Sequence, residues 1–187
     1  MKSSLSEQTG STLLEALIAM CILTVGLLGL AQVFTFGLRQ SAAAGATMVA
    51  REKAREAIES VHTARDTKVI TWAQIRNVNQ GGIFANAALT LHMAGPDNMV
   101  NTANDCTAVS LPSCPSILES IVLPGPDGKV GTSDDVRQPL DTFTRQILIE
   151  DVAGMPALRR ITVTINYRVG QLRPPPFVLV TYISSYS

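Results

Sequence analysis

The chain has 187 residues, a formal net charge of zero at pH 7 and only 5% aromatic residues. This length is enough for one globular domain in addition to a leader and a membrane helix. A surface that binds nucleic acid needs a basic patch or stacking side chains. The balanced charge and the few aromatic residues give no basis for one, so no nucleic acid is expected among the partners.

The first ten residues are polar and end in glycine, and a long apolar run follows them. We interpret residues 1–10 as a processing leader and leave them out of the expected fold. The competing interpretation is a secretory signal peptide that is cut near Ala42–Ala44. Against it, the apolar run is longer than the usual ~7–15 residues of a signal-peptide core, and Glu15 interrupts its start.

The apolar run carries no charge over 23 residues, from Ala16 to Leu38. As a helix it would cover ~35 Å, enough to cross a hydrocarbon layer of ~30 Å. Glu15 directly precedes this run. Inserting an ionisable group into a membrane helix costs ~2.5–3.5 kcal/mol near the centre of the bilayer, and such a group usually has a functional partner. If the chain is cut after Gly10, Ser11 carries a free α-amino group that would offset this charge.

The residues around this point resemble the prepilin signal of type IV pilins and type II secretion pseudopilins. The matching residues are Gly10, Thr12, Leu13, Glu15 and the run Ala16–Met20. The resemblance implies cleavage between Gly10 and Ser11 by a prepilin peptidase, methylation of the new amine, and packing of the apolar helices into a filament core. It also implies that Glu15 pairs with the amine of a neighbouring subunit. The alternative role for Glu15 is to complement the dipole at a helix N-terminus.

Two positions depart from the family pattern. The family usually has Phe directly after the cut, whereas this chain has Ser11. The family leader is usually basic, whereas Lys2 is balanced here by Glu7. Both departures are expected to affect how efficiently the peptidase cleaves the leader.

The charges beside the apolar run favour the opposite orientation to the one that the resemblance implies. Lys2 alone precedes the run, and four basic residues follow it: Arg39, Arg51, Lys53 and Arg55. Taken alone, this bias would place the C-terminal side in the cytoplasm. The resemblance implies instead a single-pass protein of the bacterial inner membrane with a periplasmic domain, and we follow it.

Helical character is expected to continue beyond the apolar run, because the first proline of the chain is Pro96. Apolar residues recur there at helical spacing: Ala50, Ala54, Ala57, Ile58 and Val61. Arg55 and Glu59 form an i,i+4 pair on the opposite face. We therefore predict one helix over about 12–63, whose second half needs a sheet to cover its apolar stripe. Gly26, Gly29, Gly37 and Gly45 mark positions of possible bending or of close helix packing.

A short repeat occurs at an offset of 30 residues, between 95–105 and 125–135. Where the second copy has Gly128 and Gly131, the first has Asn98 and Asn101, and both residue types tolerate a positive φ. The two copies are therefore expected to form the same kind of sharp turn.

The second copy is rich in oxygen ligands, with the carboxylates of Asp127, Asp134 and Asp135. Calcium takes six to eight ligands of this kind. The segment is similar to the Asp-rich calcium loop of some major pseudopilins, which would make calcium a cofactor. The alternative is a solvated acidic turn without metal. The first copy has amides where carboxylates would be needed, so we expect its affinity for calcium to be much lower.

Cys106 and Cys114 lie in a Pro-, Ser- and Asn-rich region. In an oxidising compartment these two cysteines would be able to close a short disulfide loop. Cys21 lies in the apolar run and is expected to act as a small hydrophobic residue.

Several segments rich in β-formers follow the helix. They are 88–93, 117–123, 143–151, 158–169 and 177–184. Short connections between the last three predict antiparallel neighbours. In the clearest of them, alternation places Ile161, Val163, Ile165 and Tyr167 on one face. The expected fold class is α+β, with the second half of the long helix on an antiparallel sheet, as in pilins.

The expected organisation is therefore a leader over 1–10, a membrane and polymerisation helix over 11–38, and a globular domain over 39–187. The two histidines are far apart in sequence and no glycine-rich phosphate loop is present, so no enzymatic activity is expected. The resemblance implies a minor pilin or pseudopilin, whose partners are prepilin peptidase, the inner membrane and other pilin subunits. The alternative is a single-pass anchored domain for adhesion, binding or sensing that does not polymerise.

Overall fold

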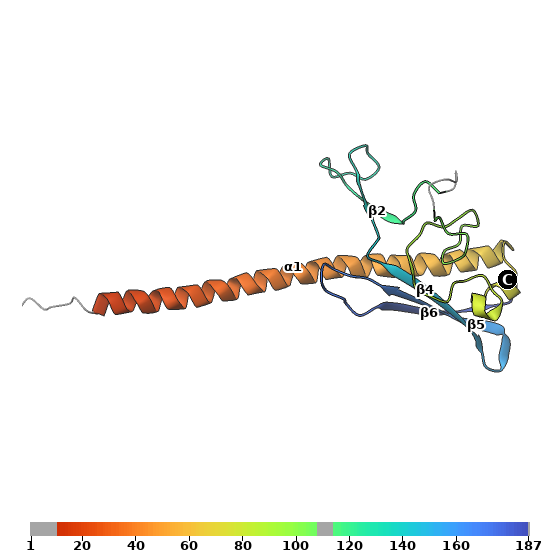
Figure 1. Ribbon diagram of the computed structural model, residues 1–187, viewed down its shortest axis with the longest axis horizontal. Coiled ribbons are helices and arrows are strands. Elements are labelled where there is room, and N and C mark those ends of the chain that lie inside the picture. The colour runs from red at the N-terminus through yellow and green to blue at the C-terminus, as the bar shows by residue number, and fades with distance from the viewer. Residues whose placement is uncertain (1–10, 108–113, 187) are drawn as a thin grey trace, which may run out of the picture. The chain divides into compact units, whose positions relative to one another are not determined.

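The computed structural model describes residues 11–107 and 114–186, so Gly10 lies outside the described residues. The chain divides into two compact units, Met1–Ala43 and Ala44–Ser187. One helix, α1 (Ser11–Asp66), begins in the first unit and ends in the second (Figure 1). The predicted long helix over 12–63 is thereby confirmed to within a few residues at each end. It continues without a break through all four glycine positions.

In the first unit, α1 presents apolar side chains on every side. Residues 13–41 are all exposed. The hydroxyls of Thr24 and Thr35 donate to the carbonyls of Met20 and Ala31, one turn earlier, at 2.9 and 3.1 Å. These bonds satisfy two polar side chains inside the helix itself. By length and composition α1 is able to span a membrane.

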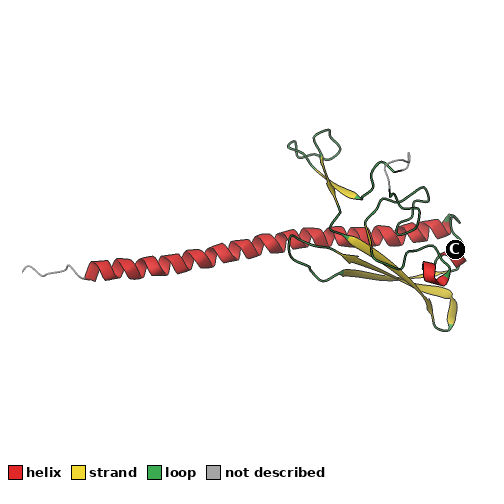
Figure 2. Ribbon diagram, in the orientation of Figure 1, coloured by secondary structure: helices red, strands yellow, loops and turns green. Residues whose placement is uncertain are grey.

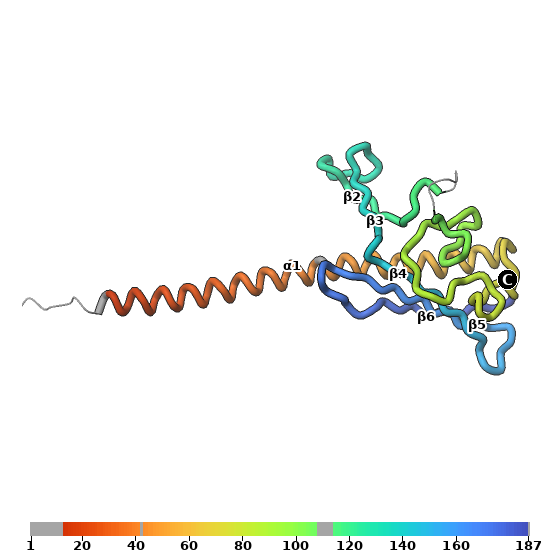
Figure 3. Tube along the Cα trace, in the orientation of Figure 1, coloured from red at the N-terminus to blue at the C-terminus, as the bar shows by residue number. Residues whose placement is uncertain are grey.

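The second unit holds a four-stranded antiparallel sheet (Figures 2 and 3). In the order in which they pair, its strands are β1 (Leu89–Thr90), β4 (Thr144–Val152), β5 (Met155–Asn166) and β6 (Phe177–Ser184). The strands predicted over 143–151, 158–169 and 177–184 correspond to β4, β5 and β6. The fold class is therefore α+β, as expected.

A separate two-stranded sheet pairs β2 (Ser120–Leu123) with β3 (Val136–Pro139). The expectation of a strand over 117–123 is correct only from Ser120. The sequence did not reveal β3, because all four of its residues are exposed and show no apolar alternation. The strand expected over 88–93 is reduced to the two residues of β1 and a single bridge between His92 and Leu118. Two short 3-10 helices, η1 (Trp72–Gln74) and η2 (Val78–Gln80), precede β1.

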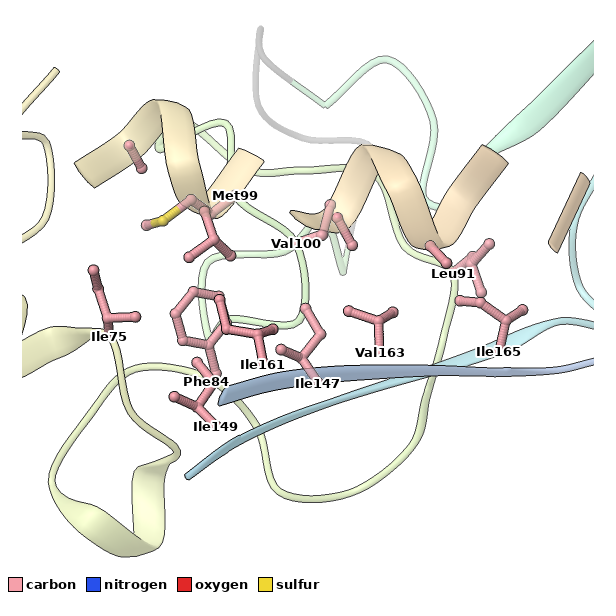
Figure 4. Packing of buried hydrophobic residues seen from close by; sticks show 14 of the residues in the cluster. Ile75, Phe84, Leu91, Met99, Val100, Ile147, Ile149, Ile161, Val163 and Ile165 are labelled. Atoms are coloured by element: carbon pink, nitrogen blue, oxygen red, sulfur yellow. The ribbon is translucent and has the colours of Figure 1, made fainter. Parts of the chain in front are cut away.

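The core of the second unit is one cluster of buried hydrophobic residues (Figure 4). From α1 it takes Ala50, Ala54, Ala57 and Val61, which are fully buried as the stripe predicted. From β5 it takes Ile161, Val163 and Ile165, and Tyr167 follows directly after the strand; these are the four residues that the alternation placed on one face. Every member of the cluster lies between Ala46 and Ile183, so this unit has its own hydrophobic core.

An asparagine side chain from the loop region closes one edge of the four-stranded sheet. The fully buried Asn77 donates its Nδ2 to the carbonyl of Ile147 and accepts the N–H of Ile149 on Oδ1, both at 2.7 Å. The amide thus pairs with β4 as another strand would. One outward carbonyl and one outward N–H of β4 beyond the short β1 are satisfied in this way.

Arg159 of β5 holds the η1 segment onto the sheet. Its guanidinium lies 4.1 Å from the ring centroid of Trp72 and donates to the carbonyls of Trp72 and Ile75. Its Nε lies 3.0 Å from a carboxylate oxygen of Asp151. Trp72 therefore has a packing role in this structure.

Candidate functional site

The residues of the expected processing and assembly site lie at the start of α1. Ser11 is the first residue of the helix, and Glu15 lies one turn later with an exposed side chain. No other described residue makes a hydrogen bond or ion pair with Glu15. Any cation that pairs with this carboxylate therefore lies outside the described residues.

The helix after Glu15 exposes an unusually large apolar surface. Its large exposed side chains include Leu17, Ile22, Leu27, Val33 and Phe36. An exposed apolar surface of this extent normally marks contact with lipid or protein. Chemically, this segment can partition into a membrane or pack against other apolar helices, and each choice removes the same surface from water.

The two repeat copies form the same turn, as expected. Asn98 and Gly128 have φ values of 54° and 70°, and Asn101 and Gly131 have values of 63° and 96°. Gly95 and Gly125 occupy equivalent tight positions. In either case a Cβ would overlap the carbonyl oxygen of the residue nine positions later, Asn104 or Asp134.

Equivalent aspartates stabilise the two turns from inside. Asp105 accepts the N–H of Asn101 at 2.8 Å, and Asp135 accepts the N–H of Gly131 at 2.6 Å. The first turn is buried at Asn101, Thr102 and Asp105, whereas most of the second is exposed. Burial raises the pKa of the Asp105 carboxyl above its ordinary value. The two copies thus have the same turn conformation, but the first is buried in the domain and the second lies on its surface.

The copies differ at the position of Asn104 and Asp134. In the first turn, the Asn104 amide donates to the Asp97 carboxylate at 3.3 Å. In the second, the Asp134 carboxylate accepts the Thr132 hydroxyl at 2.6 Å and the N–H of Asp127 at 3.3 Å. The Thr132 hydroxyl lowers the pKa of the Asp134 carboxyl, so this group remains ionised at neutral pH. An ionised carboxylate cannot donate to Asp127 as the amide donates to Asp97.

The structure places the three candidate calcium ligands in one turn, but not around one point. Asp127, Asp134 and Asp135 each accept a hydrogen bond from the turn itself. Within residues 11–107 and 114–186, no three Asp, Glu, His or Cys side chains converge as metal ligands would. One oxygen of Asp135, Oδ1, is buried without a hydrogen-bond partner in this part of the chain.

Cys106 and Cys114 form a disulfide, with their Cα atoms 5.6 Å apart. Both residues are buried. The bond closes a loop whose middle, residues 108–113, lies outside the described residues. Because Cys106 directly follows Asp105, the disulfide also anchors the end of the first turn.

A buried charged cluster was not foreseen from the sequence. Arg145 on β4 is fully buried, and its Nη2 lies 3.0 Å from Glu119, which lies 2.9 Å from the Nζ of Lys53. The Arg145 Nε donates to Asn101 at 3.1 Å. The signal that could have revealed it is alternation, because Arg145 occupies an inward position two residues before Ile147.

Two members of this cluster, Lys53 and Glu119, line a cleft of about 960 Å³ in the second unit. Lys53, Glu56 and Glu119 line it together with Pro96 and Arg137. Lys53 forms ion pairs with both Glu56 and Glu119, at 2.7 and 2.9 Å. The cluster therefore ties α1 to the sheet, and its charges are already neutralised by their neighbours.

Comparison with known proteins adds no relative. No protein-family model matches this sequence, and no curated protein and no solved structure matches it significantly.

Proposed function

We propose that this chain is a structural subunit, a minor pilin or pseudopilin, of a type IV pilus or type II secretion filament. The observation that carries the proposal is the apolar half of α1, exposed on every side directly after Glu15, which has no partner in the described part of the chain. The Gly10–Ser11 junction precedes it at the spacing that the prepilin signal has. The separately cored second unit is the part that such a filament displays on its surface.

The proposed cycle uses the same helix in two environments. The full-length chain is held in the bacterial inner membrane as a single-pass protein with a periplasmic domain. Prepilin peptidase removes residues 1–10, and the subunit then moves into the filament. There, contacts with the apolar helices of neighbours replace contacts with lipid, so little apolar surface is exposed to water at the end of the transfer.

In the filament, Glu15 pairs with the N-terminal amine of Ser11 in a neighbouring subunit. Each charge offsets the desolvation of the other, and the pair sets the axial position of one subunit relative to the next. Supporting this role, Glu15 has no partner among the described residues of its own chain.

The N-terminus of the mature chain tests this proposal. Mass spectrometry of protein purified from its own cells is expected to find a chain that begins at Ser11 with an added methyl group. Substitution of Gly10 by Ala should leave Met1 in place, which provides the unprocessed control. A wild-type chain that retains Met1 or begins near Gly45 would favour the alternative, an anchored binding, adhesion or sensor domain that does not polymerise.

We further propose that the 125–135 turn of this subunit binds calcium. The supporting observation is the comparison of the two repeat copies, in which an amide at Asn104 is replaced by an ionised carboxylate at Asp134. Asp127, Asp134 and Asp135 would supply carboxylate oxygens, and Oδ1 of Asp135 has no hydrogen-bond partner among the described residues. In the second turn, bound calcium would supply the positive charge near Asp127 that the Asn104 amide N–H supplies near Asp97 in the first turn.

Calcium removal provides the measurement. Addition of a chelator is expected to lower the melting temperature of the protein, and excess calcium should restore it. Asp134→Asn reproduces the polar pattern of the first turn, so it should fold normally and abolish the response. Asp97→Asn in the first turn is the matched control and should keep the response. If the wild-type melting temperature is the same with chelator and with calcium, the proposal is wrong and the segment is a solvated acidic turn without metal.

A further inference from the structure

Positive charge is concentrated in residues 152–187, which contain no Asp and no Glu. The charged residues of this segment are Arg159, Arg160, Arg168 and Arg173. The first two pair with carboxylates of β4, at 3.0 and 2.7 Å. Arg168 and Arg173 are exposed, and neither makes a hydrogen bond or an ion pair with any described residue. A concentration of one charge in one part of a chain is typical of proteins that contact an anionic surface.

Arg168 and Arg173 flank a tight hairpin between β5 and β6. Val169 and Leu172 exchange two backbone hydrogen bonds across Gly170 and Gln171, both at 3.0 Å. Gly170 has a φ of 59°, and a two-residue turn of this kind needs a positive φ at its first central residue. The three residues after the hairpin are prolines, each of which fixes its own φ. The two cations are therefore carried on a backbone with little conformational freedom.

The same hairpin exposes one large apolar side chain. Leu172 is 47% exposed, whereas Val169 packs against the core of the second unit. Val169 thereby attaches the hairpin to the domain, and Leu172 projects into solvent. Basic residues together with an exposed apolar side chain are the composition of segments that lie in a membrane interface.

The hairpin lies at the end of the second unit where the chain enters it. Tyr167, directly after β5, shares a hydrogen bond of 2.8 Å with Thr47 of α1, beside which Figure 3 shows the β5–β6 connection. At the other end of the sheet, Arg65 donates to the carbonyl of Ser184 at 3.0 Å. Thr47 is nine residues after Leu38, where the apolar run ends, and nine helical residues cover ~14 Å. The connection along the chain therefore keeps the hairpin close to any membrane that holds the apolar run.

We propose that the β5–β6 hairpin, residues 168–173, binds anionic phospholipids of the membrane that holds α1. The guanidinium groups of Arg168 and Arg173 contact lipid phosphates, which arginine binds in a bidentate manner. Leu172 enters the interfacial layer beside them. The inference rests on the part of the proposed function that anchors the apolar run in a bilayer, and it does not require a filament.

Two arginines and one leucine form a weak, reversible attachment. Each basic residue near an anionic membrane surface favours the bound state by about fivefold, and salt screens the attraction. Asp141 precedes β4 at the same end of the sheet, but it makes no ion pair with either arginine and does not neutralise them. The hairpin thus holds the domain against the membrane, and a subunit that moves into a filament can release it.

Fluorescence quenching in vesicles measures this contact in the full-length chain. A fluorophore is attached at the hairpin tip through Gln171→Cys, in a Cys21→Ser background so that it reacts at one site. Nitroxide groups on the lipids, just below the headgroups, quench the label when the tip touches the bilayer. In vesicles that contain phosphatidylglycerol the label should be quenched, and in vesicles of phosphatidylcholine alone most of this quenching should be lost. The same label at Ala153→Cys, in the β4–β5 turn at the other end of the sheet, should remain unquenched in both.

Substitution of the arginines tests their role. Arg168→Gln and Arg173→Gln should each lower the ratio of quenched to unquenched label by about fivefold, and the double variant by about twenty-five-fold. Arg160→Gln is the matched control, because it removes an exposed arginine of the same segment that already has a partner, and the ratio should stay within about twofold of the wild type. Inorganic phosphate should reduce the quenching no more than sodium chloride of equal ionic strength. A specific loss with phosphate would identify a site for free phosphate and overturn the proposal.

Flotation of the same vesicles separates this inference from the proposed function. All variants should float with the vesicles, because the apolar run holds the chain. If the chain floats but the label at position 171 is unquenched, or the double variant is quenched as strongly as the wild type, the inference is wrong and the proposed function is unaffected. A wild-type chain that does not float would overturn both, since each needs the membrane anchor. A quenched chain that retains Met1 in cells and is absent from filaments would contradict the filament function alone.

Discussion

Glu15→Ala is expected to leave the chain in the membrane and exclude it from filaments. Alanine removes the carboxylate but keeps the helix, so insertion into the bilayer should become slightly easier. In the filament, the N-terminal amine of a neighbour would be buried without a counter-charge. Breaking a buried ion pair from one side costs about 3–5 kcal/mol. Incorporation should therefore fall by at least about a hundredfold.

Quantification of the chain in sheared filaments and in membranes measures this effect. Glu7→Ala provides the matched control, because it removes a carboxylate from the segment that processing discards. That variant should enter filaments at the wild-type level. If Glu15→Ala does so too, the pairing role assigned to Glu15 is wrong, whereas its loss from membranes would point to a role in insertion.

Arg145→Ala is expected to destabilise the second unit by about 3–5 kcal/mol, the range for removal of one member of a buried ion pair. Its side chain is fully buried and contacts Glu119, which is 7% exposed, and Asn101. Without Arg145, Glu119 keeps only Lys53 as a counter-charge, and the Asn101 side chain loses the donor to its oxygen. A cavity adds to these losses.

Urea unfolding of the purified protein provides the free energy of unfolding. Arg160→Ala is the matched control, since Arg160 also lies in the sheet and pairs with Glu150 at 2.7 Å, but the two side chains are 48% and 41% exposed. That substitution should change stability very little. Arg145→Met keeps most of the volume, so comparing it with Arg145→Ala separates loss of charge from loss of packing. Equal stability of Arg145→Ala and the wild type would show that the buried cluster is not needed for folding.

Regular periodicity made much of the fold predictable. The α1 stripe through Ala50, Ala54 and Ala57 and the inward residues of β5 repeat over several turns or strand positions, so each member supports the others. The sequence repeat between 95–105 and 125–135 was equally informative. Asn in one copy and Gly at the matched position of the other imply the same backbone conformation. The positive φ values at Asn98 and Gly128 confirm that prediction.

Features that depend on single contacts between distant segments were not predictable. β3 has no apolar pattern, and its pairing with β2 became evident only when the structure brought the two segments together. Asn77 and Arg145 look like ordinary polar residues until their partners on distant elements are known. For the candidate assembly site, the spacing of Gly10, Ser11 and Glu15 was visible in the sequence. The proposed counter-charge of Glu15, however, lies on a neighbouring subunit, so the structure of one chain cannot contain it.

The location of the buried cluster between Ala46 and Ile183 has a consequence for how a subunit would change its surroundings. The buried hydrophobic contacts of the domain all lie beyond the apolar segment, so a change of surroundings at Leu17 or Phe36 leaves those contacts intact. Transfer of the helix from lipid to protein therefore requires no refolding of the domain. Such a subunit could be withdrawn and reinserted through many rounds of growth and retraction while its outer half keeps the same structure.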